Sequence, residues 1–299
     1  MSLGKHPVRS DFGSAGTVHR VNPLVHRPGY RHQFPIGTSG LVVGDGEFLV
    51  IAGPCSVENA GYVAIAEAVA DAGASMLRGG AWKPRTSPHS FQGLGADALE
   101  ILVAARASTG LPFVTELLDP RHVAEAAALT DLLQVGARNM SNAVLLREVG
   151  RSGVPVLLKR GFGATVEELV RAAEYLLAEG TEDVILVERG IRTFEDSTRF
   201  TLDISAVPVL RSLTHLPIIV DPSHAAGHAA FVSDLARAAA AVGADGIMVE
   251  VHVDPTIAIS DGAQTLDVPA FRALVESLDP ILAAVGKRRS RSGNAIAPV

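Results

Sequence analysis

Residues 74–108 read ASMLRGGAWKPRTSPHSFQGLGADALEILVAARAS and hold, in order, a short strand, a basic loop and a helix. The run Ser75–Leu77 has the length of a buried strand, and residues 96–108 place apolar side chains at a helical period. The loop between them contains three cations, Arg78, Lys83 and Arg85. Its glycines allow close backbone approach to a ligand and its prolines fix φ. A stiff cationic loop after a strand predicts a phosphate-binding site.

This order of strand and helix repeats along the chain from Phe48 onward, which is typical of βα units and a parallel sheet. We expect eight strands: Phe48–Ala52, Ser75–Leu77, Phe113–Thr115, Leu132–Val135, Val154–Leu158, Asp183–Val187, Pro217–Val220 and Gly246–Val249. A closed TIM (β/α)8 barrel accommodates this α/β pattern, with an open doubly wound sheet as the alternative. No Gly-x-Gly-x-x-Gly follows the first strand, which weakens a dinucleotide-binding version of the open sheet.

The helices between these strands are predicted from their Ala- and Glu-rich composition and period. They are Gly61–Asp71, Ala96–Ser108, Arg121–Ala128, Asn142–Val149, Val166–Ala178 and Phe231–Val242, with a last helix over Pro269–Val285. Glycines in the left-handed conformation commonly end helices. Five helices are expected to end in this way, at Gly73, Gly110, Gly150, Gly180 and Gly243.

The chain outside the barrel lacks such periodicity. Residues 1–38 are expected to form an irregular arm, and the apolar runs around Gly44–Gly46 predict a hairpin over Leu41–Ile51. Residues 39–285 would form one catalytic barrel domain. Residues 286–299 begin with a basic run and are expected to be a disordered tail.

Composition excludes several classes of protein. The 299 residues are 47% hydrophobic with a net charge of −6, which fits a globular chain and does not favour nucleic acid or an anionic membrane as partner. The single cysteine, Cys55, excludes an intramolecular disulfide and fits a reducing compartment. No long apolar run or signal-peptide core is present, so we expect a cytoplasmic protein.

In a barrel of this kind the catalytic groups lie at the C-terminal ends of the strands. Each predicted strand end carries a polar or ionisable group, and four of these groups suit a divalent metal: Cys55, His224, Glu250 and Asp261. Sulfur, imidazole and carboxylate ligands favour Mn, Fe, Co or Zn over Ca or Mg. Taken singly, Cys55 fits a small buried hydrophobe and His224 a turn residue, so the metal interpretation depends on the shared rim.

The same rim carries the cations Arg78, Lys83, Arg138, Lys159 and Arg189. Several cations converging on one pocket predict a substrate with more than one anionic group. We expect at least one of the five to be held instead in a structural ion pair with Glu116, Glu188 or Asp203.

These strand-end motifs, taken together, resemble those of type I 3-deoxy-D-arabino-heptulosonate 7-phosphate (DAHP) synthases, in the subgroup that includes 3-deoxy-D-manno-octulosonate 8-phosphate synthases. The resemblance covers residues 41–282. It is carried by residues 53–56 (Gly-Pro-Cys-Ser), 83–87 (Lys-Pro-Arg-Thr-Ser), 136–139, 158–161, 188–194, 221–224, 250–252 and 260–262.

The resemblance implies that phosphoenolpyruvate (PEP) condenses with D-erythrose 4-phosphate and water to give DAHP and phosphate, the first step of aromatic amino acid biosynthesis. Lys83-Pro84-Arg85 favours erythrose 4-phosphate, because octulosonate synthases carry Lys-Ala-Asn-Arg there. The alternative acceptors are arabinose 5-phosphate or another aldose. Cys55 implies dependence on a divalent metal, with Mn²⁺ favoured and Fe²⁺, Co²⁺ or Zn²⁺ acceptable.

The family also implies roles for individual residues. Arg78, Arg138, Lys159 and Arg189 would hold PEP, whereas Lys83, Pro84, Arg85, Thr86 and Ser87 would hold the aldose phosphate. Lys159 and Glu116 would orient the water that moves protons, and His224 would be both a ligand and a neighbour of the departing phosphate. Two positions depart from the family pattern: His228 stands where a basic residue is expected, and His89 where an aromatic residue such as Tyr is expected.

The expected assembly is a homodimer or homotetramer. Little intrinsic inhibition by aromatic amino acids is expected, although a separate regulatory partner would be able to confer it. A non-catalytic barrel serving as scaffold is the remaining alternative, and the combined ligand set argues against it.

Overall fold

The computed structural model describes residues 22–44, 46–84, 87 and 89–291. Eight parallel strands form a closed barrel, because β10 pairs with both β9 and β3. The strands are β3 (Glu47–Gly53), β4 (Met76–Arg78), β5 (Phe113–Leu117), β6 (Leu132–Val135), β7 (Val156–Lys159), β8 (Val184–Glu188), β9 (Ile218–Val220) and β10 (Gly246–Glu250). Each begins and ends within two residues of its predicted bounds, so the barrel prediction is confirmed and the open sheet is wrong.

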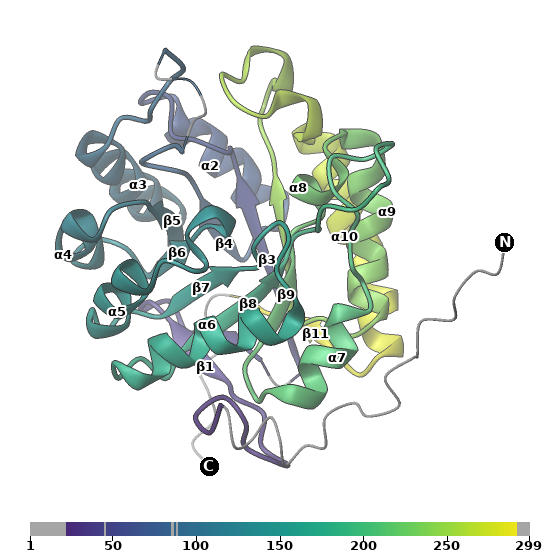
Figure 1. The fold of residues 1–299 in the computed structure, drawn as a ribbon. Coiled ribbons are helices and arrows are strands. Elements are labelled where there is room, and N and C mark those ends of the chain that lie inside the picture. The colour runs from purple at the N-terminus through teal and green to yellow at the C-terminus, as the bar shows by residue number, and fades with distance from the viewer. Residues whose placement is uncertain (1–21, 45, 85–86, 88, 292–299) are drawn as a thin grey trace, which may run out of the picture.

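Helices surround the barrel (Figure 1). They are α2 (Tyr62–Asp71), α3 (Ala96–Thr109), α4 (Val123–Ala127), α5 (Ala143–Arg151), α6 (Val166–Ala178), α7 (Ala206–Leu213), α8 (Pro222–Ala226), α9 (Ala229–Ala241) and α10 (Val268–Ala284). α7 and the short α8 were not predicted; in α7, Pro208 interrupts a short apolar run. Proline is tolerated in the first turn of a helix, where no intrahelical N–H donor is required.

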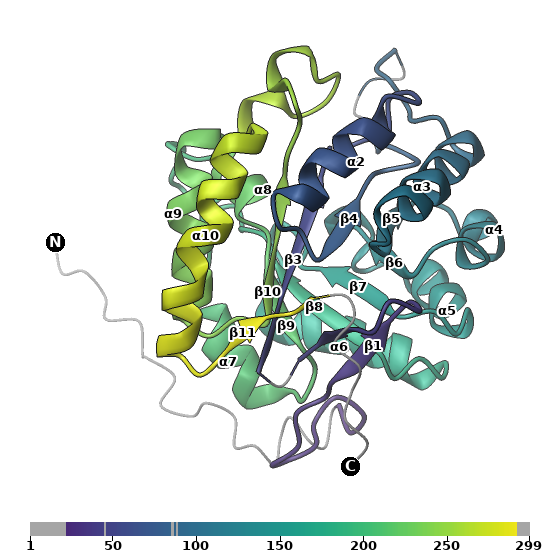
Figure 2. The same ribbon diagram turned by 180° about the vertical axis from the view of Figure 1, so that it is seen from behind.

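A hairpin closes the barrel interior at the N-terminal ends of the strands (Figure 2). It consists of β1 (Phe34–Ile36) and β2 (Leu41–Val43), paired antiparallel with Phe34 opposite Val43. Its side chains join the inward-facing core of Leu49, Met76, Val114 and other strand residues. The predicted hairpin over Leu41–Ile51 is therefore wrong. β3 pairs with β4 and β10 instead of β2, because closure of the barrel requires two parallel neighbours for that strand.

The described parts of the two ends are bound to the barrel. In the arm, Val25 is fully buried and His32 Nε2 lies 2.7 Å from Asp183 Oδ1. After α10, β11 (Arg288–Arg289) pairs parallel with β3, and Lys287 Nζ lies 2.5 Å from Asp245 Oδ1. The expectation of a disordered tail from residue 286 thus fails for residues 287–290. None of the described helices is long and apolar enough to cross a membrane.

The helix-ending glycines follow the prediction with one exception. Gly110 ends α3 with φ +71°, and Gly73, Gly180 and Gly243 also have positive φ. Gly150 instead lies inside α5, where a Cβ would approach the Leu176 carbonyl to 2.9 Å. It is required for the close packing of α5 against α6, and the helix runs on to Arg151.

Candidate active site

A cavity of about 300 Å³ opens at the C-terminal ends of the strands. All five predicted cations line it, together with Pro84, Glu116, His224 and Asp261. Arg78 and Lys159 are the last residues of β4 and β7, and Glu116 lies in β5. Neighbouring parallel strands end at the same rim of the barrel, so residues far apart in sequence reach one pocket.

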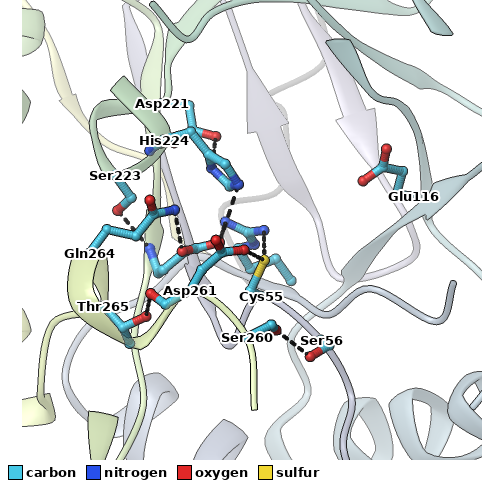
Figure 3. A network of polar contacts seen from close by, with 12 residues as sticks. Cys55, Ser56, Glu116, Asp221, Ser223, His224, Ser260, Asp261, Gln264 and Thr265 are labelled. Atoms are coloured by element: carbon cyan, nitrogen blue, oxygen red, sulfur yellow. Dashed lines mark hydrogen bonds and ion pairs between the residues drawn. The ribbon is translucent and has the colours of Figure 1, made fainter. Parts of the chain in front are cut away.

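The four candidate metal ligands meet beside this cavity (Figure 3). One ligand atom from each of Cys55, His224, Glu250 and Asp261 lies within 4.8 Å of the others. They come from the residues after β3, from α8, from the end of β10 and from the loop that follows it. Figure 3 shows Cys55, His224 and Asp261 turned toward one another, whereas Glu116 lies apart from them.

His224 is oriented by a carboxylate that also builds its helix. Asp221 caps α8, since Oδ1 accepts from the His224 backbone N–H at 3.0 Å. Asp221 Oδ2 lies 2.8 Å from His224 Nδ1, which leaves Nε2 facing Glu250 Oε1 at 3.4 Å. Burial lowers the pKa of His224, which favours the neutral ring that a metal ligand requires. A carboxylate next to the second nitrogen of a ligand histidine is common at metal sites.

Cys55 and Glu250 complete a donor set that suits a cation. The Cys55 thiol donates to Asp261 Oδ2 at 2.9 Å, and burial together with Glu250 raises its pKa to about 12. Glu250 is fully buried, and its Oε1 has no hydrogen-bond partner among the described residues. A buried carboxylate oxygen that accepts no hydrogen bond, beside a thiol and an imidazole, fits a divalent ion, which would also displace the thiol proton.

Three of the cations contact these ligands or the carboxylate that orients His224. Arg78 Nη1 lies 3.3 Å from Glu250 Oε1, Lys159 Nζ lies 2.6 Å from Asp221 Oδ2, and Lys83 Nζ donates to Cys55 Sγ at 2.8 Å. The pKa of Asp221 is well below its usual value; burial alone would raise it, but His224 and Lys159 outweigh that effect. Burial lowers the pKa of Lys159 in spite of Asp221.

The expected ion pairs with Glu116, Glu188 or Asp203 do not form with any of the five cations in the described part of the chain. Arg160 takes that role, with Nη1 at 2.7 Å from Glu188 and 2.8 Å from Asp203. Successive side chains at the end of a strand point to opposite sides. Lys159 points into the cavity, so the next residue, Arg160, points away from it toward Glu188 and Asp203.

Arg138 and Arg189 are held by aromatic rings instead of carboxylates. Phe162 and Phe200 stack with centroids 5.1 Å apart, and the Arg189 guanidinium carbon lies 4.1 Å from the Phe200 centroid. Arg138 lies 5.4 Å from the Phe162 centroid. Burial lowers the pKa of Arg189 to about 10, so it stays protonated at neutral pH. Among described residues neither arginine has an ion pair with a carboxylate, which leaves both charges available to an anionic ligand.

Glu116 occupies a position shaped by glycine. Gln134 Nε2 donates to Glu116 Oε2 at 3.1 Å. A Cβ on Gly136 would lie 1.9 Å from Glu116 Oε1. The carboxylate therefore fills the space that any larger residue at position 136 would need.

The acceptor loop is described only in part. Lys83 and Pro84 line the cavity, while Arg85 and Thr86 lie outside the described residues. Ser87 is half-buried, its Oγ accepts from the His89 N–H at 3.3 Å, and it is not among the described residues that line the cavity. His89 is exposed, and His228 caps α9.

Several residues of the site were missed in the sequence. They are Asp221, Gln134, Phe162, Arg199, Phe200 and Gln264. Asp221 carried a usable signal, since Asp before Pro commonly begins a helix. Gln264 and Phe162 carried none, because their roles depend on contacts between distant segments.

Comparison with known proteins agrees with this geometry. Residues 33–283 match the family model described as the DAHP synthetase I family. A phospho-2-dehydro-3-deoxyheptonate aldolase of Thermotoga maritima is 48% identical over 88% of this chain and 78% of its own. A 2-dehydro-3-deoxyphosphooctonate aldolase of Syntrophotalea carbinolica is 32% identical over 79% and 91%.

Solved structures point the same way. The crystal structure of the Thermotoga maritima enzyme, named as a DAHP synthase, superposes with a TM-score of 0.83 at 46% identity, covering 87% of this chain and 76% of the other. A truncated form of that enzyme gives 0.83 at 43% identity, covering 90% and 100%. With its barrel, its strand-end cavity and this similarity, the chain belongs to the DAHP synthetase I family.

Proposed function

We propose that this protein is a metal-dependent 3-deoxy-7-phosphoheptulonate synthase, which condenses PEP with D-erythrose 4-phosphate and water to give DAHP and phosphate. The observation that carries the proposal is one cavity lined by seven cations, the five predicted ones among them, and bordered by a four-ligand cluster. Two anionic substrates repel each other in water, so a pocket that neutralises both makes a large contribution by positioning them together.

PEP fits the inner part of this cavity. Arg138 and Arg189 have charges uncompensated by described carboxylates, whereas Arg78 lies beside Glu250 and Lys159 beside Asp221. A guanidinium binds two oxygens of a phosphate or carboxylate at once, so the pair Arg138 and Arg189 suits the PEP phosphate. Arg78 and Lys159 would then hold the carboxylate. Phe162 and Phe200 limit the movement of the guanidinium groups.

Cys55, His224, Glu250 and Asp261 would hold the metal, with Mn²⁺ favoured and Fe²⁺, Co²⁺ or Zn²⁺ also compatible with the donor set. When bound, the ion supplies Lewis-acid polarisation of the aldehyde oxygen. Asp221 Oδ2, 2.8 Å from His224 Nδ1, would limit rotation of the ring away from the cluster.

Lys159 and Glu116 are the groups suited to moving protons. Both line the cavity, and burial lowers the pKa of Lys159, which eases release of a proton from its ammonium. Glu116 is kept in place by Gln134 and by the absence of a side chain on Gly136. We assign these two residues to the water that adds at C2 of PEP.

The acceptor is proposed to be the four-carbon sugar phosphate. Lys83 and Pro84 line the cavity, and the motif they begin, Lys83-Pro84-Arg85, is the form that favours erythrose 4-phosphate. The 48% identity to the heptonate aldolase exceeds the 32% identity to the octonate aldolase, which supports the same choice. We further propose a homodimer or homotetramer, in which any inhibition by aromatic amino acids would come from a separate regulatory partner.

The test is phosphate release from PEP with erythrose 4-phosphate, measured on protein stripped with EDTA and on the same protein after Mn²⁺ is returned. The proposal predicts turnover only with both substrates and the metal present. Turnover that is equal with and without EDTA would contradict the metal assignment. Mn²⁺ binding without phosphate release would contradict the reaction.

A further inference from the structure

Gln264 is a buried side chain that links two of the candidate metal ligands. It is 2% exposed and lies in η4 (Gly262–Gln264), beyond β10. Its Nε2 donates to Glu250 Oε2 at 2.7 Å, and its Oε1 accepts from Arg199 Nη1 at 2.8 Å. Arg199 Nη1 also donates to Asp261 Oδ1 at 3.0 Å. One amide and one guanidinium therefore connect the carboxylates of Glu250 and Asp261.

This link leaves one oxygen of each carboxylate facing the cluster. Glu250 gives Oε2 to Gln264, so Oε1 faces the cluster, 3.4 Å from His224 Nε2 and 3.3 Å from Arg78 Nη1, with no hydrogen-bond partner among described residues. Asp261 gives Oδ1 to Arg199, so Oδ2 points at Cys55 Sγ, 2.9 Å away. Without these bonds each carboxylate would lose a contact that resists rotation about its terminal torsion, which is a soft one.

The backbone of Asp261 depends on the same segment. Asp261 has φ +58° and ψ +26°, and it is the one non-glycine residue with positive φ in the described part of the chain. This conformation is uncommon for an L residue, although Asp tolerates it better than most. The Asp261 carbonyl accepts from Thr265 Oγ1 at 2.9 Å and from the Gln264 N–H at 3.2 Å. The turn that directs the carboxylate inward is thus held by its own loop (Figure 3).

Arg199 acts from the outer side of the cluster. Its side chain is 39% exposed, and it lines both the 300 Å³ cavity and a second, more open cavity of about 420 Å³. Asp261 lines both cavities too, so these two residues form part of the wall between them. An exposed guanidinium contributes little to the stability of the fold. Its hydrogen bonds to Asp261 and Gln264 instead orient these two side chains in the site.

We propose that Gln264 and Arg199 are positioning residues for the metal, which fix Glu250 and Asp261 as ligands that each present a single oxygen, Oε1 and Oδ2. The inference rests on the proposed function, because it takes the four-residue cluster as the metal site. Partners that orient a ligand from behind it commonly change metal affinity by tenfold to a hundredfold when they are removed.

The experiment compares the full-length protein with Gln264→Leu, Arg199→Met and a matched control, Gln134→Leu. Gln134 is also buried and also donates its amide to a carboxylate of the cavity, Glu116, but it contacts no candidate ligand in the described part of the chain. Mn²⁺ affinity is measured without substrates, from the electron paramagnetic resonance signal of free Mn²⁺. The visible spectrum of Co²⁺-loaded protein reports the ligand geometry.

The inference predicts that Gln264→Leu weakens Mn²⁺ binding by about tenfold to a hundredfold. Arg199→Met should weaken it by about tenfold, and both variants should change the Co²⁺ spectrum. Gln134→Leu should leave affinity and spectrum unchanged. Circular dichroism on each metal-free variant checks folding, and Arg199→Met, at an exposed side chain, carries the test even if Gln264→Leu fails to fold.

Three outcomes would overturn it separately. If the unaltered protein binds Mn²⁺ while both variants bind it as tightly and give the same Co²⁺ spectrum, the positioning role is wrong and the metal site stands. If the unaltered protein binds neither ion, the metal site itself is wrong and the inference falls with it. A lower melting temperature with unchanged affinity would show a structural role only, and would also contradict the inference.

Discussion

At the scale of single residues, the site depends on contacts that place one charged group relative to another. Glu116 is the clearest case, because its carboxylate fills the space left by the missing side chain of Gly136. Gly136 has φ −71°, so an alanine there meets no backbone penalty. A methyl group at position 136 would therefore displace the Glu116 carboxylate without straining the backbone.

Gly136→Ala is predicted to move Glu116 and to lower kcat by about tenfold or more, with little change in melting temperature. The carboxylate is the end of a flexible side chain, so it moves in preference to the backbone. Gly163→Ala is the matched control, because a Cβ at Gly163 meets no atom within 4 Å. Steady-state kinetics and thermal melts check both variants. An unchanged kcat in Gly136→Ala would remove Glu116 from the proposed mechanism.

The proposed proton-transfer residues give a second prediction at this scale. Lys159→Ala and Glu116→Gln should each lower turnover by about 10² to 10⁴-fold, the usual contribution of a general acid or base. Their Mn²⁺ affinity should change much less, since neither residue belongs to the ligand cluster. Single-turnover kinetics beside Mn²⁺ titration separates the two effects. If turnover is unchanged in both variants, the assignment is wrong.

At the scale of elements, the ends of the chain stabilise the N-terminal side of the barrel. Ser290 is 2% exposed, and its Oγ donates to the Val42 carbonyl at 2.6 Å and accepts from the Val42 N–H at 3.3 Å. Its carbonyl accepts from Ser75 Oγ at 2.6 Å. The short segment after α10 thus joins the β1–β2 hairpin to the barrel.

Ser290→Ala is predicted to lower the free energy of unfolding by about 1–3 kcal/mol, because it leaves both buried backbone groups of Val42 unpaired. The control is Ser212→Ala on α7, where an exposed serine donates to the Val209 carbonyl at 2.7 Å. Urea unfolding of the two variants measures the difference. Equal stability would mean that the segment is not bound to the hairpin as described.

The arm adds a prediction about pH. His215 Nδ1 lies 2.8 Å from the Val25 carbonyl, and burial lowers the pKa of His215 to about 4. The unfolded chain, with a pKa near 6.5, binds the proton more readily, so this residue contributes stability above pH 6.5 that is lost as the pH falls toward 4. When the pH is lowered from 7.5 to 5, the melting temperature of His215→Gln should therefore fall by less than that of the unaltered protein. Equal losses would contradict the assignment.

The barrel elements could be predicted from the sequence because each βα unit is local. A short apolar run followed by a helical period specifies a strand and its helix without knowledge of the neighbours. The hairpin and the tail could not be predicted in that way. β3 pairs with two barrel strands instead of β2 because the barrel must close. Residues 287–290 are held in place by contacts with Asp245 and Val42, which are distant in sequence.

The candidate site shows the same division. Residues at strand ends, such as Lys159 and Glu250, were predictable because the fold brings all strand ends to one rim. Their partners were not, since Asp221, Gln264 and Arg199 act through side-chain directions that no spacing in the sequence specifies. The ion pair of Arg160 with Glu188, in place of one involving Lys159, has the same cause.

At the scale of the whole molecule, the charge of the cavity is opposite in sign to the net charge of the chain. The chain has a net charge of −6, whereas its strand-end cavity is lined by seven cations: Arg78, Lys83, Arg138, Lys159, Arg189, Arg192 and Arg199. A cationic cavity in an acidic protein concentrates the field where anionic substrates bind and lowers non-specific binding elsewhere. Such a molecule is suited to two phosphorylated substrates at once. The protein is therefore best tested by how strongly it discriminates between erythrose 4-phosphate and arabinose 5-phosphate.

The most direct test is the ratio of kcat/KM for erythrose 4-phosphate to that for arabinose 5-phosphate, measured with PEP and Mn²⁺ and repeated in EDTA. The account predicts a strong preference for the four-carbon sugar and loss of both activities in EDTA. A preference for the five-carbon sugar, or turnover that persists in EDTA, would contradict it.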